Sequence, residues 1–341
     1  MDGTVTRDGD EDPLLSVRDL RTQFPTAQGT VRAVDGVSFD VYPGETVCLV
    51  GESGSGKTVT CESIARLVDE PGEVVGGEVR FDDRDLVSRS EREIRSVRGD
   101  RIAYVFQDPQ QALDPVYEIG AQVAEVVGYH RAVSDAAARE RAVELLDRVG
   151  LPNAADRADD YPHQLSGGMK QRVAIAMALA GDPDLLIADE PTTALDVTIQ
   201  AQILDLFADL GEREGLATLF VTHDLGVVAG IADRVVVMYG GHVMERGDVR
   251  QVFERPAHPY TRALLASLPG RGGERIGGEP PNLRDPPDGC RFHPRCPHAV
   301  GECSSGEGPP LYDAPAGGEA ACVFYDGVRD PSVLDEDGGA P

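Results

Sequence analysis

The feature that most constrains this chain is a glycine-rich loop placed between an apolar strand and a helix. The loop, GESGSGKT, follows the run TVCLV at 46–50 and precedes the helical pattern TVTCESIARLV. Glycines let successive backbone N–H groups face a phosphate at a helix N-terminus. In such a loop Lys57 reaches the β- and γ-phosphates, and the Thr58 hydroxyl ligates Mg²⁺. The pattern therefore predicts a P-loop for a nucleoside triphosphate, with the binding residues Gly51, Glu52, Ser53, Gly54, Ser55, Gly56, Lys57 and Thr58.

Short apolar runs alternate with helical patterns along the chain and predict the fold class. After TVCLV, the runs are IAYVF (102–106), DLLIADE (184–190), ATLFVT (217–222) and RVVVMY (234–239). Almost wholly apolar strands of this kind form a parallel sheet covered on both faces. Alternating segments at 15–24, 33–41 and 77–82 predict a smaller antiparallel layer, and 110–165 reads as a helical insertion. We therefore expect an α/β P-loop NTPase with a mostly parallel sheet and a small antiparallel β layer.

Two adjacent acids end the apolar run at 184–190. Strand ends of this kind face the ligand crevice of an open α/β sheet. Asp189 is therefore expected to hold the water shell of Mg²⁺, while Glu190 orients and polarises an attacking water. The sequence thus predicts Asp189 as a metal-site residue and Glu190 as a catalytic residue.

A second helix start suited to an anion lies before the helix VAIAMALA. Its serine can cap the helix, and its glycines allow a phosphate to approach closely. On its own this could be only a capped helix. Together with the two nucleotide motifs, however, LSGG-x-x-Q-R resembles the signature of the ABC-transporter ATPase family. The signature residues are Leu165, Ser166, Gly167, Gly168, Met169, Lys170 and Gln171.

Further positions match this family in order. Gln107 resembles the Q-loop residue that touches Mg²⁺ and relays to the membrane subunits. His223 resembles the switch histidine that contacts the γ-phosphate. Phe24 is the candidate for the aromatic residue that stacks on adenine, with Val31 nearby in the same loop region. The residues that resemble the D-loop are Ala194, Leu195 and Asp196.

The resemblance narrows to the ATPases of dipeptide and oligopeptide importers, and to their D-type subunit, over about residues 14–325. It rests on the segments 107–120, 188–204, 254–269 and 289–299. It implies a subunit that sandwiches ATP against a second ATPase subunit, either an F-type partner or another copy. It also implies two membrane permease subunits, an extracellular substrate-binding protein that acts indirectly, and a peripheral place on the cytoplasmic face of the membrane.

Three alternatives compete with a peptide importer. Some relatives import nickel or other cargo, so the cargo stays open at this point. A soluble ABC ATPase of translation or repair usually carries two tandem cassettes or a long coiled-coil insertion, and the sequence has neither. A simple nucleotide kinase lacks the LSGG element.

The charge balance bears on partners and environment. With 32 basic and 59 acidic residues the formal net charge is −27, so nucleic acid is not expected as a partner. No run approaches the roughly 18 apolar residues of a membrane span, and the N-terminus is acidic, which predicts a cytoplasmic protein. The two lysines, Lys57 and Lys170, both fall inside motifs. The excess of acid favours adaptation to high salt over codon bias in a GC-rich genome, which explains arginine but not acid.

Composition divides the chain into four parts. An acidic tail at 1–13 precedes an ABC ATPase domain at 14–269, whose helical subdomain spans about 110–165. A Gly- and Pro-rich extension of the peptide-importer type follows at 270–325, and a frayed tail at 326–341. The extension is so poor in apolar residues that we expect a covalent or metallic group to hold it together.

Four cysteines of the extension follow the spacing C-x5-C-x6-C-x18-C, namely Cys290, Cys296, Cys303 and Cys322. Disulfides are disfavoured in a reducing cytoplasm. Zinc usually binds closer cysteine pairs, although His293 or His298 could replace a thiolate. Four thiolates on irregular loops favour a [4Fe–4S] cluster, and the matching tail of D-type relatives points the same way. Zinc, free thiols and a disulfide stay as alternatives, while Cys48 and Cys61 are expected in the core.

Overall fold

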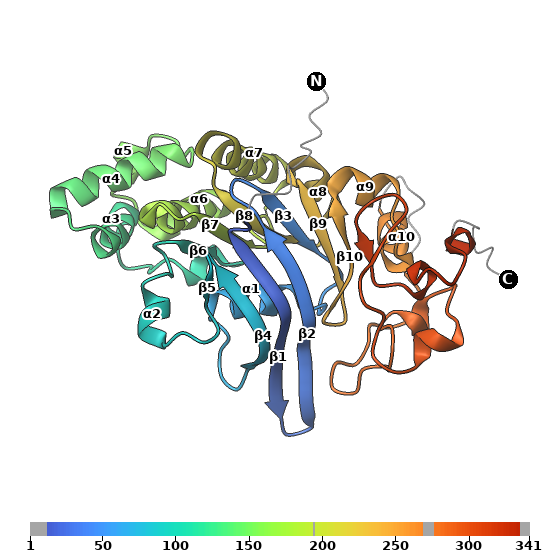
Figure 1. Cartoon of the computed structure of the whole chain (residues 1–341). Helices are drawn as coiled ribbons and strands as arrows, with labels where there is room; N and C mark the ends of the chain where they lie inside the picture. Colours follow the sequence, from blue (N-terminus) through green and yellow to red (C-terminus); the bar gives the residue numbers. More distant parts are fainter. Residues whose placement is uncertain (1–11, 194, 269–275, 335–341) are drawn as a thin grey trace.

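An eight-stranded sheet forms the centre of the molecule (Figure 1). The computed structural model describes residues 12–193, 195–268 and 276–334. The strands of this sheet are β3 (Thr46–Val50), β6 (Ile102–Val105), β7 (Leu185–Asp189), β8 (Ala217–Thr222), β9 (Arg234–Tyr239), β10 (His242–Asp248), β11 (Tyr312–Asp313) and β12 (Glu319–Ala320). Their order is β11-β12-β10-β9-β3-β8-β7-β6, and the pairs from β9 to β6 are parallel.

The central strands are buried on both faces. Every residue of β3, β7 and β8 is buried, as the unbroken apolar runs predict. Cys48 and Cys61 both have 0% exposure, which confirms their expected place in the core. The predicted fold class, an α/β structure with a mostly parallel sheet, is confirmed.

A second, antiparallel sheet packs against one face of the first. Its strands are β1 (Leu15–Thr26), β2 (Gly29–Val41), β4 (Glu73–Phe81) and β5 (Arg84–Asp85), in the order β2-β1-β4-β5. Phe24 and Val31, expected in a loop, are instead cross-strand partners near the tip of the β1–β2 hairpin. Helix α1 (Lys57–Ala65) lies between the sheets and ends earlier than its pattern predicts, because Arg66 adopts a left-handed conformation with φ 55°.

Most helices cover the other face of the central sheet, whereas α1 and α2 (Glu91–Arg95) pack on the side of the antiparallel sheet (Figure 1). The helical insertion contains α3, α4 and α5, which lie within the expected segment 110–165. No helix in the described part of the chain combines the length and apolar character that crossing a bilayer requires. The helices are α2 (Glu91–Arg95), α3 (Ile119–His130), α4 (Asp135–Arg148), α5 (Ala154–Arg157), α6 (Gly167–Ala178), α7 (Val197–Glu214), α8 (Leu225–Ile231), α9 (Val249–Glu254) and α10 (Pro259–Ala266).

The C-terminal extension is built into the cassette instead of standing apart from it. Strands β11 and β12 prolong the central sheet beyond β10. Phe292, 1% exposed, packs edge-on against Tyr239 with ring centroids 5.4 Å apart and lies 5.3 Å from Tyr260. Arg291 forms a 2.6 Å ion pair with Asp35 of β2. The extension therefore packs more of its own residues against the cassette than its composition predicts, whereas the expected covalent or metallic group stays a prediction.

The end of the described chain is also ordered by packing. Residues 331–334 form a 3₁₀ turn, and Leu334 is 3% exposed against Cys322 and Phe324. The predicted frayed tail thus does not begin at 326. Residues 1–11, which make up most of the predicted acidic tail, and residues 335–341, the last part of the predicted frayed tail, lie outside the described residues.

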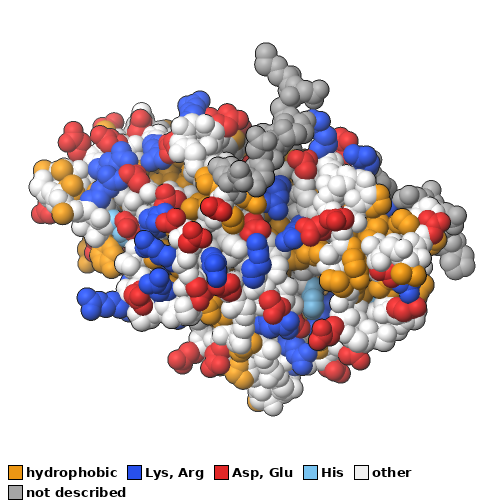
Figure 2. Space-filling view, viewed as in Figure 1, with side chains coloured by type: hydrophobic (Ala, Val, Ile, Leu, Met, Phe, Trp, Pro, Cys, Tyr) orange, Lys and Arg blue, Asp and Glu red, His pale blue; other side chains and the backbone are white. Residues whose placement is uncertain are grey.

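The surface mixes charges of both signs. Figure 2 shows acidic and basic side chains interspersed across one face of the molecule. Many arginines of the described residues pair with carboxylates, as Arg18 does with Asp40 at 2.7 Å. The net negative charge is consequently dispersed on this face.

Candidate nucleotide-binding and hydrolysis site

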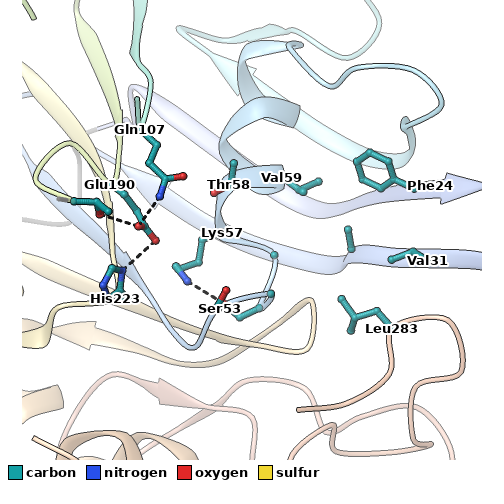
Figure 3. A pocket seen from close by; sticks show the side chains of 15 residues that line it. Phe24, Val31, Ser53, Lys57, Thr58, Val59, Gln107, Glu190, His223 and Leu283 are labelled. Atoms are coloured by element: carbon teal, nitrogen blue, oxygen red, sulfur yellow. Dashed lines mark hydrogen bonds and ion pairs between the residues drawn. The ribbon is translucent and has the colours of Figure 1, made fainter. Parts of the chain in front are cut away.

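A cleft of about 720 Å³ opens where the P-loop, the β1–β2 hairpin and the ends of β7 and β8 meet (Figure 3). One end is apolar and the other end carries amide, carboxylate and imidazole groups, with Lys57 between them. The lining residues are Phe24, Val31, Ala33, Ser53, Gly54, Ser55, Gly56, Lys57, Thr58, Val59, Gln107, Glu190, Thr193, His223 and Leu283.

The P-loop backbone depends on glycine at two positions. Gly51 has φ 152°, and a Cβ there would lie 2.1 Å from the Met238 carbonyl oxygen. Gly56 has φ 101°, and a Cβ there would lie 2.4 Å from the Ala33 carbonyl oxygen. No side chain fits either approach, so the loop can curl against β2 and β9 only with these glycines. The following N–H groups then open α1 toward the cleft.

Lys57 is almost buried and points into the cleft. Its Nζ donates to the carbonyl oxygens of Gly51 and Glu52 at 2.9 and 3.0 Å. Burial lowers its pKa, while the nearby carboxylates of Glu190 and Asp189 act against this shift. Because a phosphate group is a stronger partner for an ammonium than two carbonyls are, the lysine is placed to transfer to a bound triphosphate.

The side chains expected at the Mg²⁺ are in contact. Thr58 donates from Oγ1 to Asp189 Oδ1 at 3.2 Å, and Tyr104 donates its hydroxyl to Asp189 Oδ2 at 3.2 Å. Asp189 is 3% exposed, and burial raises its pKa. A divalent cation would relieve this cost, since it stabilises the carboxylate in a site with hard oxygen ligands. The pair Thr58 and Asp189 therefore fits a Mg²⁺ site, with Gln107 at the cleft wall.

Glu190 collects the polar groups at the other end of the cleft. Its carboxylate accepts hydrogen bonds from Gln107 Nε2 at 3.1 Å and Thr193 Oγ1 at 2.9 Å, and lies 3.2 Å from His223 Nδ1. Glu190 follows β7 with φ 45°, an uncommon conformation for this residue, and its N–H donates to Val221 in β8. The backbone turn thus aims a carboxylate into the cleft beside Lys57, where it can polarise water.

The signature segment forms a capped helix start outside this cleft. Ser166 is the N-cap of α6, and its hydroxyl accepts from the Met169 N–H. A Cβ on Gly168 would lie 2.3 Å from the Ile199 side chain, so this glycine lets α6 pack on α7. Among the described residues, none of the segment 165–171 lines the cleft.

The D-loop follows the catalytic acid. Asp196 caps α7 by accepting from the Ile199 N–H at 3.0 Å. Leu195 packs against the large core cluster. Its Cδ2 atom would lie 3.7 Å from a Cβ placed on Gly167 of the signature segment. Ala194, also predicted for the D-loop, lies outside the described residues.

Four residues that line the cleft or contact its predicted site residues were not predicted from the sequence. Thr193 follows Glu190 by three positions, so a search for polar neighbours of Glu190 along the chain could have found it. Tyr104 lies in the apolar run 102–106, 85 positions from Asp189, and only the pairing of the two strands brings them together. Leu283 and Arg295 belong to the extension, and Arg295 pairs with Glu52 of the P-loop at 2.7 Å. No local pattern announces either of these two.

Comparisons with known proteins agree with this geometry. Residues 34–193 match a family model described as "ABC transporter", and residues 244–303 match one described as "Oligopeptide/dipeptide transporter, C-terminal region". The oligopeptide transport ATP-binding protein OppD of Bacillus subtilis is 51% identical over 294 residues, 84% of this chain and 82% of the relative. The chain belongs to the peptide-transport family of ABC ATP-binding proteins. The dipeptide transport ATP-binding protein DppD of Escherichia coli is 46% identical over 316 residues, 91% of this chain and 96% of the relative.

A solved structure supports the same assignment for the cassette. The dimeric ATP-binding cassette MJ0796, in a post-hydrolysis state bound to ADP and phosphate, is 31% identical with a TM-score of 0.63. The similarity covers 69% of this chain and 99% of MJ0796. The predicted family, cassette fold and ATPase class are therefore confirmed.

In this peptide-transport ABC protein the four cysteines of the extension are free thiols, of which Cys290, Cys303 and Cys322 are buried and Cys296 is partly buried. Burial raises the pKa of Cys290 to about 11 and the pKa values of Cys296 and Cys322 to about 12, and the charges of neighbouring thiols add to each increase. Within 12–193, 195–268 and 276–334, however, no group of three or more His, Cys, Asp or Glu side chains is arranged to hold a metal ion. His293 instead directs Nδ1 to the Cys290 carbonyl oxygen at 2.9 Å.

Proposed function

We propose that this chain is the ATP-hydrolysing subunit of an importer that takes up dipeptides and oligopeptides through membrane permease subunits. The single observation that carries the cargo class is the match of 244–303 to the oligopeptide/dipeptide transporter C-terminal region. The same chain carries the P-loop cleft with Lys57 and Glu190. Nickel or another cargo lacks a corresponding observation.

The side chains divide the work along the cleft. Backbone N–H groups of the P-loop and Lys57 bind the β- and γ-phosphates, and Thr58 with Asp189 holds the Mg²⁺ that neutralises their charge. Glu190 accepts a hydrogen bond from the attacking water, so the water's oxygen becomes more nucleophilic toward the γ-phosphorus. Gln107 and His223 share the Glu190 carboxylate and lie where they detect whether the γ-phosphate is present.

Hydrolysis needs a second ATPase subunit in this proposal. The signature helix start lies outside the chain's own cleft, although it has the capped N-terminus that suits a phosphate. A second subunit could supply that element across an interface, and MJ0796, which shares the cassette fold, is a dimer. Either an F-type ATPase or another copy of this chain would occupy that place. Two acidic subunits would repel each other until ATP and Mg²⁺ bridge them.

The remaining partners follow from the importer assignment. Two permease subunits would place the chain peripherally on the cytoplasmic face of the membrane. A substrate-binding protein would reach it only indirectly, through those permeases. The exposed side chains of Phe106, Tyr117 and Tyr129, which lie beside or within the helical insertion, offer apolar contact area for such a partner.

The test is transport by the reconstituted complex. The chain is co-purified with the permeases and second ATPase encoded beside it and placed in proteoliposomes with the cognate binding protein. Radiolabelled tripeptide should accumulate only with ATP and Mg²⁺ on the ATPase side, and Glu190→Gln should abolish accumulation. ATP-dependent uptake of ⁶³Ni²⁺ without peptide uptake would replace the peptide assignment with the nickel alternative, and ATPase activity without permease association would favour a soluble role.

We further propose that Cys290, Cys296, Cys303 and Cys322 hold a [4Fe–4S] cluster with a structural or redox-sensing role. Its support is the burial of four thiols that affect one another's ionisation, contributed by separate turns of the extension. Binding would deprotonate the thiols. Burial raises the pKa values of Cys290, Cys296 and Cys322, so these three are otherwise kept neutral.

Iron content tests the cluster directly. Anaerobically purified protein should be brown, with a shoulder near roughly 400 nm and about four irons per chain. Cys296→Ser should lose the colour, whereas Cys61→Ser, a buried cysteine of the cassette, should keep it. A colourless anaerobic preparation with one zinc per chain would establish the zinc alternative, and one with neither metal would establish free thiols.

We also propose that the acidic surface is an adaptation to high salt. The support is the dispersal of charges on the visible face, together with the placing of both lysines in functional motifs, Lys57 in the P-loop and Lys170 in the signature helix. A melting experiment in potassium chloride, described below, separates this proposal from codon bias.

A further inference from the structure

The extension reaches the ATP cleft through a short turn around Leu283. The Arg32 N–H of β2 donates to the Leu283 carbonyl oxygen at 2.9 Å. Beside it, Arg284 donates to the Gln28 amide oxygen in the hairpin turn at 2.8 Å. A residue more than 250 positions away along the chain is thus fixed against the hairpin that carries Phe24.

Leu283 belongs to the apolar end of the cleft. It lines this end with Phe24, Val31, Ala33 and Val59. In Figure 3, Phe24 and Leu283 lie on opposite sides of Val31, and the polar groups around Glu190 lie at the far end beyond Lys57. With the triphosphate on Lys57, the base of a nucleotide extends toward this apolar end. A planar base would then contact an aromatic ring and a leucine side chain.

We propose that Leu283 is a nucleobase-contacting residue, so that the C-terminal extension supplies part of the ATP site. The inference rests on the chain's use of ATP and not on its cargo. Removal of the leucine should weaken contact with the base while the phosphate contacts stay intact.

Arg295 is a positioning residue that joins the extension to the ATP cleft at a second place, the P-loop. Its guanidinium, 4% exposed, makes a two-pronged contact with the Glu52 carboxylate of the P-loop, at 2.7 and 3.1 Å. The same guanidinium donates to the carbonyl oxygens of Ile276 and Gly277, which lead toward Leu283. The Glu52 N–H donates to the Tyr260 hydroxyl at 2.9 Å. One arginine therefore joins the P-loop to the segment that carries the base contact.

Loss of Arg295 should weaken binding of the triphosphate group. Without its partner the Glu52 carboxylate becomes an unneutralised negative charge beside the triphosphate-binding loop. Arg295→Gln should therefore lower the affinities for ATP and for inorganic triphosphate alike, by about tenfold. Adding Glu52→Gln to this variant should recover most of the affinity, since it removes the unpaired charge. A merely structural role of Arg295 would give no such recovery.

Competition binding to the full chain separates the two contacts. A fluorescent ATP analogue is displaced by ATP or by inorganic triphosphate, each with Mg²⁺. For Leu283→Ala we expect the affinity for ATP to fall by about fivefold and the affinity for inorganic triphosphate to stay unchanged. Val328→Ala is the matched control for the leucine, since this aliphatic side chain of the extension is 86% exposed. Arg329→Gln is the control for the arginine, because Arg329 pairs with Asp326 and Glu302 inside the extension.

Specific outcomes would overturn the inference. If Leu283→Ala lost affinity equally for ATP and for triphosphate, or lost none for either, the proposed contact between Leu283 and the base would be wrong. If Arg295→Gln bound triphosphate as tightly as the wild type, the proposed positioning role of Arg295 would be wrong. It would also be wrong if adding Glu52→Gln to this variant restored no affinity. ATP hydrolysis by the wild-type chain together with its second ATPase subunit shows that such a failure concerns these contacts and not the ATPase function.

Discussion

The ATP cleft and the C-terminal extension are built by different means. The cleft is made of loops at the ends of regular strands, and its polar groups pair there, Thr58 with Asp189 and Gln107 with Glu190. The extension has little regular structure beyond two-residue strands and 3₁₀ turns. Long-range contacts such as Phe292 with Tyr239 and Arg295 with Glu52 hold it in place.

This difference separates two kinds of vulnerability. A change at the cleft's strand ends alters a charge or a proton acceptor while the sheet keeps its shape, so chemistry should suffer before stability does. A change in the extension removes a docking contact, so stability should suffer first. The two regions meet at Glu52, which belongs to the P-loop and is held by an arginine of the extension.

The largest expected effect is in the cleft, with Glu190→Gln. The amide keeps the shape of the side chain and leaves Asp189 in place, but it is a poor proton acceptor. Turnover in the presence of the partner subunits should fall by roughly 10²–10⁴-fold while ATP affinity is kept. Glu78→Gln, in an exposed ion pair of the antiparallel layer, should stay close to wild type. Hydrolysis near the wild-type rate would take the catalytic role away from Glu190.

The next effect belongs to the extension. Phe292→Ala leaves a cavity between Tyr239 and Tyr260, so the free energy of unfolding should fall by about 3–5 kcal/mol. Urea unfolding of the full chain measures this value, with Tyr129→Ala, 76% exposed, as a control for loss of an aromatic ring. A loss as small as that of the control would mean that the extension is not docked through Phe292.

A smaller effect appears as pH is lowered. Burial lowers the pKa of His258, at the start of α10, to about 3. The unfolded chain, with an ordinary histidine pKa near 6.5, binds the proton more readily, so this group costs stability as pH falls from about 6.5 toward 3. Between pH 7 and pH 5 the loss should be ~2 kcal/mol.

Substitution of the histidine isolates that effect. His258→Gln should flatten the dependence of unfolding free energy on pH between 7 and 5, even if the variant is less stable throughout. His163, a partly exposed histidine near the signature segment, serves as the control for His→Gln. A wild-type curve that is flat over this interval would contradict a neutral, buried His258.

The smallest effect concerns salt and the whole surface. If the net charge of −27 reflects adaptation to high salt, molar potassium chloride should raise the melting temperature by about 2–4 °C per kcal/mol of relieved repulsion. ATP must be absent, because a bound ligand also stabilises the fold. A melting temperature independent of salt would favour codon bias as the origin of the arginines.

The sequence predicted most of the cleft because its signals are local. The P-loop spacing defines one strand, one loop and one helix start, and paired acids after an apolar run mark a strand end. The hairpin was harder, because the pairing of Phe24 with Val31 depends on register across two strands and not on either segment alone. The early end of α1 depends on the left-handed Arg66, which no helix pattern reveals.

The docking of the extension could not be read from the chain. Arg295 and Glu52 are 243 positions apart, and Arg295 alone reads as an ordinary surface charge. Phe292 is a single aromatic residue in a Gly- and Pro-rich segment, so composition underestimates what it buries. Pairing over such distances is set by the whole topology, which composition and periodicity do not encode.

The position of β3 has a consequence for how the protein is made. This strand, at 46–50, lies between β9 and β8, which occupy 217–239. During synthesis at about 5–20 residues per second, the strand that leads into the P-loop waits roughly ten seconds or more for its neighbours to leave the ribosome. Until then a wholly apolar strand has no partners on either side. The nascent chain therefore needs protection from aggregation over that interval, and slow codons between 51 and 216 would lengthen it.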